Sequence, residues 1–444
     1  MEKVIVLALD GLSWNLIEEL IEINKCKNLK NLIDNGSSGV LRAEDFLSTP
    51  KIFCSIFTGK KVEKHGIKDF YSKEEDLCSE QIWDILFKRG FKIGLYRPLS
   101  VWSANEFFDF CIPNPLLLEK ETYPKNLSFI GELDKRARSE KYSLKFLIQF
   151  FFKLIKFKFP IRKLFQIIKR SIKLNFRKSL EERMYLIKEI ELIIHTNLYY
   201  KILCRYKSHF TVFFDYSFDT LGHIYWRNKG ENSNFHEVLP NAYEIVDNFI
   251  GKVKNFAEKS DYHLFICSDH GFDKVEKKYR EDFRMINVHF LLRELNFYYD
   301  VYGIYMTYSV VFKMRPNSSR SIKDFEKAME NVTCDGKPLF FIRQTSKKII
   351  VKINDFFGNN KNYKVNLPNG KILNLDQIID FHPGHSGTHN ENYGVFISHG
   401  TKIKEGNKIK DITPYDITPT ILYLFGESIP SEMDGIVLKN IFNI

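Results

Sequence analysis

The fold of this chain is constrained most strongly by three short apolar runs. Each run is followed by polar residues of the kind that act in catalysis or bind metal ions. The runs are Val4–Leu9 before Asp10, Phe210–Phe214 before Asp215, and Leu264–Cys267 before Ser268, Asp269 and His270. Each run is rich in β-branched or aromatic residues and is bounded by turn residues. Such runs are typical of strands that are buried on both faces.

Amphipathic helical patterns lie between these runs, over Trp14–Ile33, Tyr185–Tyr206 and His236–Glu258. The alternation predicts an α/β fold, with a mostly parallel sheet flanked by helices. Ligands of such sheets bind beyond the carboxyl ends of the strands. We therefore expect the acids that follow the three runs to share one site.

Two regions interrupt the alternation and divide the 444-residue chain. We expect a catalytic α/β core made of 1–103, 205–296 and 381–444, with a helical basic amphipathic insertion over 104–204. A small α+β cap is expected over 297–380, because strand-like runs such as Lys348–Ile353 alternate there with turn clusters.

The net charge of +11 originates in one segment, 141–180, which holds twelve Lys or Arg and no Asp or Glu. Its basic and polar residues recur every three or four positions and share one helix face, with Leu164, Phe165, Ile168 and Ile172 opposite. This pattern fits peripheral contact with an anionic membrane. It also fits a lid whose apolar face packs on the core. Nucleic acid is the least favoured partner, because the aromatic residues do not interleave with the basic ones.

The cysteines and the lengths of the apolar runs bear on location. Seven scattered cysteines form no Cys-x-x-Cys pair and no disulfide-scaffold spacing, which favours a reducing cytoplasm. Lysines interrupt every apolar run before it reaches the roughly 18 residues of a spanning helix. We expect a cytoplasmic protein that does not cross a membrane, with contact at a membrane surface as one of the alternatives for 141–180.

Four segments offer carboxylates and imidazoles of the kind that bind metal ions. Asp219 and His223 are four residues apart, Asp10 ends the first strand, Asp269 and His270 follow a later one, and His389 ends a turn-rich segment. Taken singly, an Asp after a strand is more often a helix cap and a lone His an interior hydrogen-bonded residue. Together, Asp and His without Cys suit zinc, manganese or iron, and they suffice for two ions.

The chain resembles the alkaline phosphatase superfamily, and within it the type I phosphodiesterase/nucleotide pyrophosphatase family. The matching motifs occur in family order: Leu7–Trp14, Asn28–Leu32, Ser48-Thr-Pro50 with Phe57-Thr-Gly59, Lys64–Ile67, Asp219–His223, Ser268–Gly271, Gly387–His389, and Asp411–Leu422 with Met433-Asp-Gly435. They cover most of 1–100, 209–275 and 380–444 and leave the two interrupting regions outside.

The resemblance implies a role for each matching residue. One metal would be held by Asp219, His223 and His389, and the other by Asp10, Thr49, Asp269 and His270. Thr49 would attack phosphorus and carry a covalent phosphoryl group that water then hydrolyses. Zinc is the usual metal of the family, and manganese is an alternative.

Departures from the family pattern bear on the substrate. Relatives that cleave nucleotides read Thr-Phe-Pro-Asn at the nucleophile, where this chain has Thr49-Pro-Lys-Ile52, and Phe70 stands near the place of a second phosphate-binding Asn. Lys51 is a candidate for the missing phosphate contact, or a solvated lysine at a helix start. His382 and His385 could contact the substrate or support the metal ligands.

We therefore predict a metal-dependent phosphoester hydrolase, with a phosphodiesterase as the first hypothesis. A phosphomonoesterase or phosphotransferase, acting on a lipid- or glycan-linked phosphate through the same Thr49, is the alternative. A metal-binding partner protein without turnover is a third hypothesis, which would predict broken ligand positions.

Overall fold

The computed structural model describes residues 1–444 except 44–47, 71, 103, 115–120, 140–143, 177–179, 227–235, 276–282, 307–308, 316–317, 346–347, 355, 357–362, 383–385 and 444. The chain forms two compact units. The first consists of Met1–Gly131, Ile148–Val275 and Ser386–Ile444, and the second of Glu132–Leu147 and Glu276–His385. The expected division into a catalytic core, a basic insertion over 104–204 and a cap over 297–380 stays a prediction.

The first unit is built on an eight-stranded sheet in the order β20-β2-β19-β6-β1-β5-β3-β4. The strands are β1 (Val4–Leu9), β2 (Ser37–Leu41), β3 (Ile93–Tyr96), β4 (Phe110–Ile112), β5 (Phe210–Asp215), β6 (His263–Cys267), β19 (Gly394–His399) and β20 (Asn407–Ile412). Only β19 runs antiparallel to its neighbours β2 and β6. The predicted mostly parallel α/β sheet is confirmed.

Strand β1 lies at the centre of this sheet, and all six of its residues are buried. It pairs in parallel with β5 and β6, with Leu9 opposite Asp215 and Ala8 opposite Cys267. This register ends the three strands at one edge. The chain segments that leave them, and the polar residues on those segments, therefore emerge together.

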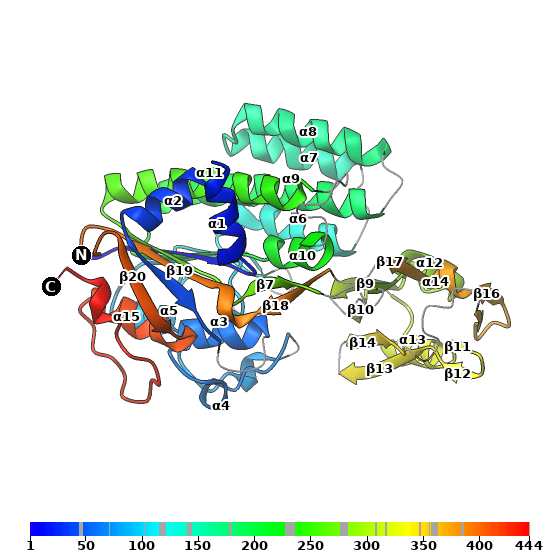
Figure 1. Cartoon of the computed structure of the whole chain (residues 1–444). Helices are drawn as coiled ribbons and strands as arrows, with labels where there is room; N and C mark the ends of the chain where they lie inside the picture. Colours follow the sequence, from blue (N-terminus) through cyan, green and yellow to red (C-terminus); the bar gives the residue numbers. More distant parts are fainter. Residues whose placement is uncertain are drawn as a thin grey trace. The chain divides into compact units, whose positions relative to one another are not determined.

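Helices cover both faces of the sheet. Figure 1 draws α9, α10 and α11 on one side and α3, α5 and α15 on the other. The helices of this unit include α1 (Trp14–Glu22), α2 (Lys27–Asp34), α3 (Thr49–Thr58), α4 (Val62–His65), α5 (Ile82–Lys88), α8 (Ile161–Phe176), α9 (Leu180–Tyr206), α10 (Ser217–Tyr225), α11 (Val238–Ser260) and α15 (Ile417–Leu424). Phe53 and Ile56 of α3 pack with Val4 and Val6 of β1 in the core that fixes α3 on the sheet.

The predicted helix over Trp14–Ile33 is two helices, α1 and α2. The break falls at Asn24, which has a φ of 60°, and Lys25 N–H donates to the Leu20 carbonyl. Asparagine tolerates the left-handed conformation better than most residues, so it ends α1 at little cost. Asp247 of α11 then accepts from the backbone N–H groups of Asn28 and Leu29, at 3.2 and 2.8 Å, and holds the start of α2.

The second unit combines small antiparallel sheets with short helices. Its strands are β8 (Phe283–Ile286), β9 (Val301–Met306), β10 (Ser309–Met314), β11 (Thr333–Cys334), β12 (Lys337–Pro338), β13 (Phe340–Thr345), β14 (Lys348–Ile353), β15 (Lys364–Asn366), β16 (Ile372–Asn374) and β17 (Ile379–His382). Its helices include α12 (Val288–Glu294), α13 (Ile322–Glu330) and α14 (Leu375–Ile378). Phe312, Phe325 and Val351 are central to its own hydrophobic core. The strand predicted at Lys348–Ile353 is confirmed.

Two further helices straddle the boundaries between the units, α6 (Ser128–Ser139) and α7 (Leu144–Lys156). Among the described residues, no helix combines the length and the apolar content needed to cross a bilayer.

His65 connects α3 to the loop that follows α4. Its Nδ1 accepts a hydrogen bond of 3.1 Å from Ile67 N–H, so the ring's proton is on Nε2, which donates to Ser55 Oγ at 3.1 Å. The ring is fully buried, and burial lowers the pKa of His65 to about 4. The neutral ring is therefore the form that supports α3.

This burial predicts an acid-dependent loss of stability. The unfolded chain binds a proton at His65 near pH 6.5 and the folded chain only near 4, so stability falls as the pH drops through this interval. We expect His65 to contribute a loss of about 2 kcal/mol between pH 7 and pH 5. Urea unfolding of wild type and His65→Gln at both pH values measures it. The same pH dependence in both proteins would contradict the assignment.

Candidate active site

Asp10 is the first residue after β1 and lies at the centre of the polar cluster. Its carbonyl accepts from Asp219 N–H at 3.1 Å, and Gly11 N–H donates to Asp269 Oδ1 at 3.3 Å. Gly11 has a φ of 76°, and a Cβ there would lie 2.8 Å from the Asp219 nitrogen. Glycine is therefore required for the β1 turn to approach α10 this closely.

Thr49 is the first residue of α3 and is 5% exposed. Its Oγ1 donates a hydrogen bond of 3.4 Å to Asp10 Oδ1. Pro50, in the first turn, has a fixed φ that suits a helix start. The hydroxyl thus points at the carboxylate cluster from the amino-terminal end of a ten-residue helix.

Asp219 and His223 lie one helical turn apart on α10, with His223 Nε2 3.2 Å from Asp219 Oδ1. His223 Nδ1 is 3.1 Å from the Gly387 carbonyl, which can only accept. The ring's proton is therefore on Nδ1, and Nε2 presents a lone pair to the cluster.

Asp269 and His270 follow β6. His270 Nδ1 lies 3.0 Å from the Gly271 carbonyl and donates to it, so Nε2 again presents a lone pair. His270 Nε2 and Asp269 Oδ2 are buried and have no hydrogen-bond partner, and they lie 3.4 Å from each other. Buried polar atoms are almost always satisfied, so this orientation toward a common point indicates a ligand that is not part of the chain.

A short antiparallel pair brings the last ligand to the cluster. Strand β18 (Gly387–Asn390) pairs with β7 (Gly271–Lys274), with His389 opposite Phe272. His389 Nε2 is 3.0 Å from Asp219 Oδ1 and 2.8 Å from His223 Nε2. Its ring stacks on that of His270 at a centroid distance of 3.6 Å.

The charges in this cluster are strongly coupled. Burial and the neighbouring charges of Asp269 and Asp219 raise the pKa of Asp10 well above its ordinary value. Burial would also raise the pKa of Asp219, but His223 and His389 outweigh it and lower that pKa well below its ordinary value. Burial lowers the pKa of His270 to about 4. Neutral imidazoles and crowded carboxylates are the forms that bind a divalent cation.

The residues form two sets of candidate metal ligands: Asp219, His223 and His389, and Asp10, Asp269 and His270. In each set the three ligand atoms lie within 4.8 Å of one another. His270 Nε2 is 3.8 Å from Asp219 Oδ1, so the two sets adjoin. Nitrogen and oxygen donors in this number fit zinc or manganese.

Among the described residues, none of the other candidates belongs to these two ligand sets. Lys51 is half-buried in the first turn of α3, and Phe70 is 39% exposed. His382 ends β17 in the second unit, and His385 lies outside the described residues.

Sequence reasoning missed a buried ion pair that supports α10. Asp215 Oδ1 accepts from Ser217 N–H at 2.8 Å, at the start of the helix that carries Asp219 and His223. Asp215 Oδ2 lies 3.6 Å from Arg97 Nη1, and both side chains are at most 2% exposed. Arg97 Nη2 also donates to Tyr216 Oη at 3.1 Å. The sequence shows the acid at the end of β5, but no sequence spacing links Asp215 to Arg97.

The Thr49 hydroxyl and two adjoining Asp/His sets thus lie together at the carboxyl edge of a mostly parallel sheet, an arrangement that suits a metal-dependent enzyme. The family model of type I phosphodiesterase / nucleotide pyrophosphatase matches residues 4–343. The chain belongs to this family and is a phosphoester hydrolase of the phosphodiesterase type.

Solved structures to which the chain is similar include murine and human ectonucleotide pyrophosphatase/phosphodiesterase 5. The murine protein matches with 12% identity and a TM-score of 0.46, over 97% of this chain and 96% of that one. The human protein matches with the same identity and TM-score over 100% of both chains. No curated protein matches the sequence significantly.

The Arg97–Asp215 pair predicts a stability difference that depends on charge. Arg97→Met leaves a buried carboxylate without its cation, which costs about 3–5 kcal/mol. Adding Asp215→Asn removes that charge, while the amide oxygen still accepts from Ser217 N–H. We expect the double variant to be more stable than Arg97→Met in chemical denaturation. Equal stability of Arg97→Met and wild type would show that the pair is not required.

Proposed function

We propose that Thr49 is the nucleophile of a two-metal phosphodiesterase and carries a covalent phosphoryl intermediate. The observation that supports this most is the position of its hydroxyl, 3.4 Å from Asp10 Oδ1. That oxygen in turn lies 3.4 Å from the buried His270 Nε2, which has no hydrogen-bond partner. Family membership supplies the reaction class.

Each metal has its own ligands in this proposal. Asp219, His223 and His389 hold one ion, and Asp10, Thr49, Asp269 and His270 hold the other. When bound, the two ions supply positive charge that lowers the pKa of the hydroxyl and stabilises the phosphoryl oxygens and the leaving oxygen. Zinc is the first choice, and manganese suits the same donors.

The chain's own groups position the reaction. Asp10 accepts the hydrogen bond of Thr49 and fixes the direction of its oxygen before attack. The threonine oxygen forms a bond to phosphorus as the bond to the leaving alcohol breaks. The amino-terminal end of α3 places its positive dipole beside the transferred phosphoryl group. Water then attacks the phosphothreonine, which releases phosphate monoester and restores the hydroxyl.

The substrate is proposed to differ from the nucleotides that relatives with Thr-Phe-Pro-Asn cleave. Ile52 is 4% exposed and packs in the core, so it offers no contact to a substrate phosphate. Lys51 is half-buried two residues after Thr49 and is proposed as the phosphate contact instead. A lipid- or glycan-linked phosphate, cleaved as a diester or as a monoester through the same Thr49, suits this site. Rates on bis-p-nitrophenyl phosphate and p-nitrophenyl phosphate separate the two activities.

Replacing the hydroxyl tests the nucleophile. Thr49→Ala should lower kcat at least about 10³-fold, because no other group forms the covalent intermediate. Thr49→Ser retains the oxygen and should keep measurable turnover with a trapped phosphoserine detectable by mass spectrometry. Near-normal turnover of Thr49→Ala would overturn the assignment.

Removing one ligand from each set tests the two-metal arrangement. His223→Ala should lose metal from one set, and Asp269→Ala from the other, because each removes one of few donors. Elemental analysis of the purified variants should give about half of the wild-type metal content in both cases. Wild-type metal content in both variants would contradict the assignment of these ligand sets.

We also propose that 141–180 contacts an anionic membrane. On α7 and α8, seven large apolar side chains recur at helical spacing and are 40–70% exposed: Ile148, Phe152, Ile155, Ile161, Phe165, Ile168 and Ile172. The expected apolar face is thus divided, because Leu164 and Ile167 are buried while Phe165 and Ile168 are exposed. An exposed apolar row with lysines beside it suits the interface of an anionic bilayer.

The cytoplasmic location stays a prediction.

Vesicle flotation tests this contact. Phe152→Gln/Phe165→Gln removes two side chains that are each 67% exposed and should reduce binding to phosphatidylserine-containing vesicles more than tenfold, since each buried aromatic contributes about 1.5–3 kcal/mol. Phe341→Gln, at a position 59% exposed in the second unit, is the matched control. Wild-type binding that does not depend on anionic lipid would argue against the proposal.

A further inference from the structure

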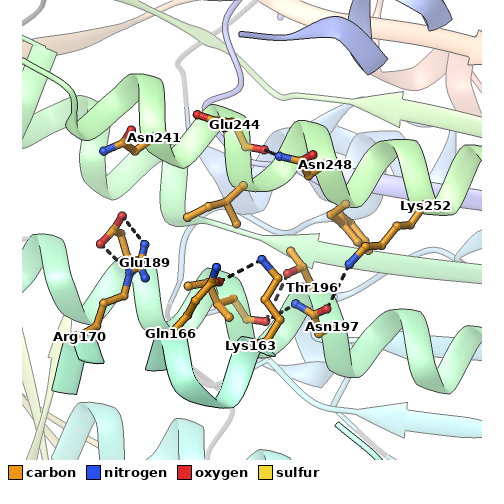
Figure 2. Close-up of a pocket in the computed structure, with 13 residues that line it drawn as sticks. Lys163, Gln166, Arg170, Glu189, Thr196, Asn197, Asn241, Glu244, Asn248 and Lys252 are labelled. Atoms are coloured by element: carbon orange, nitrogen blue, oxygen red, sulfur yellow. Dashed lines mark hydrogen bonds and ion pairs between the residues drawn. The ribbon is translucent and has the colours of Figure 1, made fainter. Parts of the chain in front are cut away.

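A polar crevice lies among α8, α9 and α11, separate from the metal-ligand sets. It encloses about 260 Å³, and Figure 2 shows the side chains that line it. Its charged and polar lining includes Lys163, Gln166, Arg170, Glu189, Asn197 and Lys252. None of them belongs to the candidate metal ligands.

Two lysines face this crevice from different helices. Lys163 Nζ of α8 donates to Gln166 Oε1 at 3.0 Å, and Lys252 Nζ of α11 donates to Asn197 Oδ1 at 3.3 Å. Within the described ranges, neither ammonium group has a carboxylate within 4.0 Å. Each ammonium has three donors, so amide oxygens satisfy them only in part.

The crevice's buried acid does not neutralise these lysines. Glu189, whose side chain is 4% exposed, pairs with Arg170 through two hydrogen bonds of 2.9 and 3.3 Å. Glu244 lines the crevice but is exposed. The Asn197 side chain is also held in place, because its amide nitrogen donates to the Ile193 carbonyl. This hydrogen bond directs Asn197 Oδ1 toward Lys252. The positive charge at the lysine end is therefore uncompensated by a buried acid.

Neighbouring positive charges act on both lysines. Partial burial lowers the pKa of Lys252, whose side chain still reaches solvent, and the charges of Lys163 and Lys201 lower it further. Burial and the charge of Arg170 lower the pKa of Lys163. An anion between the two ammonium groups would relieve both effects.

We propose that this crevice is a second anion site, which binds a phosphate group between Lys163 and Lys252. Lysine suits phosphate because it contacts a tetrahedral oxyanion as a point charge, whereas the arginine that would grip a planar carboxylate is already paired. The phosphate belongs either to a soluble molecule or to a lipid headgroup. A lipid source is compatible with the exposed Phe165 and Ile168 on the same helix. The site shares no residue with the proposed phosphodiesterase centre, so each can fail alone.

Lysine footprinting of the metal-loaded wild-type protein tests the site. Acetylation at Lys163 and Lys252 is followed by mass spectrometry with inorganic phosphate, with chloride at the same ionic strength, and with phosphatidylcholine vesicles with or without phosphatidic acid. Lys254, on the same helix but paired with Glu258 at 2.7 Å, is the internal control. Phosphate binding should protect Lys163 and Lys252 and leave Lys254 unchanged.

The outcome also separates the sources of phosphate. Protection by inorganic phosphate indicates a soluble ligand, and protection only by phosphatidic acid vesicles indicates a headgroup. In either case, Lys163→Gln should raise the concentration of inorganic phosphate or phosphatidic acid that protects Lys252 at least about tenfold. This is the effect expected from losing one charge-assisted hydrogen bond. Lys254→Gln should not, and neither variant should change turnover of bis-p-nitrophenyl phosphate. No protection in any arm, equal protection by chloride, or equal protection of Lys254 would overturn the site.

Discussion

The parallel register of β1 with β5 and β6 is the constraint on which the rest of the site depends. Because Leu9 lies opposite Asp215 and Ala8 opposite Cys267, three strands end together. The residues that follow them then approach within hydrogen-bond distance, as Asp10 and Asp219 do through a backbone bond of 3.1 Å. A shift of register would separate these carboxylates and leave each of them an ordinary strand-end acid.

The site concentrates charge that the chain alone does not balance. Asp10 and Asp269 crowd each other in a buried setting, and burial together with this repulsion raises the pKa of Asp10. His223 and His270 each donate from Nδ1 to a backbone carbonyl, which directs both Nε2 atoms inward. Divalent cations are the proposed source of the positive charge that would let these carboxyl groups ionise together.

The insertion illustrates how one helix can serve two surfaces. The inner side of α8 buries Leu164 and Ile167 and brings Lys163 and Arg170 to the crevice, while its outer side exposes Phe165 and Ile168. A sequence pattern shows that such a helix has an apolar side, but not how wide that side is or which part is covered. Packing against α9 decides this, since it buries only part of the apolar surface.

The sequence by itself determined the α/β class, the strands at Val4–Leu9 and Lys348–Ile353, and the family. Apolar runs and short motifs consist of residues that are neighbours in the chain, so they can be recognised without the tertiary structure. The sequence did not determine the break at Asn24, the pairing of β7 with β18, or the Arg97–Asp215 ion pair. Nor did it locate the crevice among α8, α9 and α11. Only the tertiary structure decided these. The strand pairing, the ion pair and the crevice join residues that are far apart in the chain, and Asp247 of the distant α11 holds the start of α2 after the break.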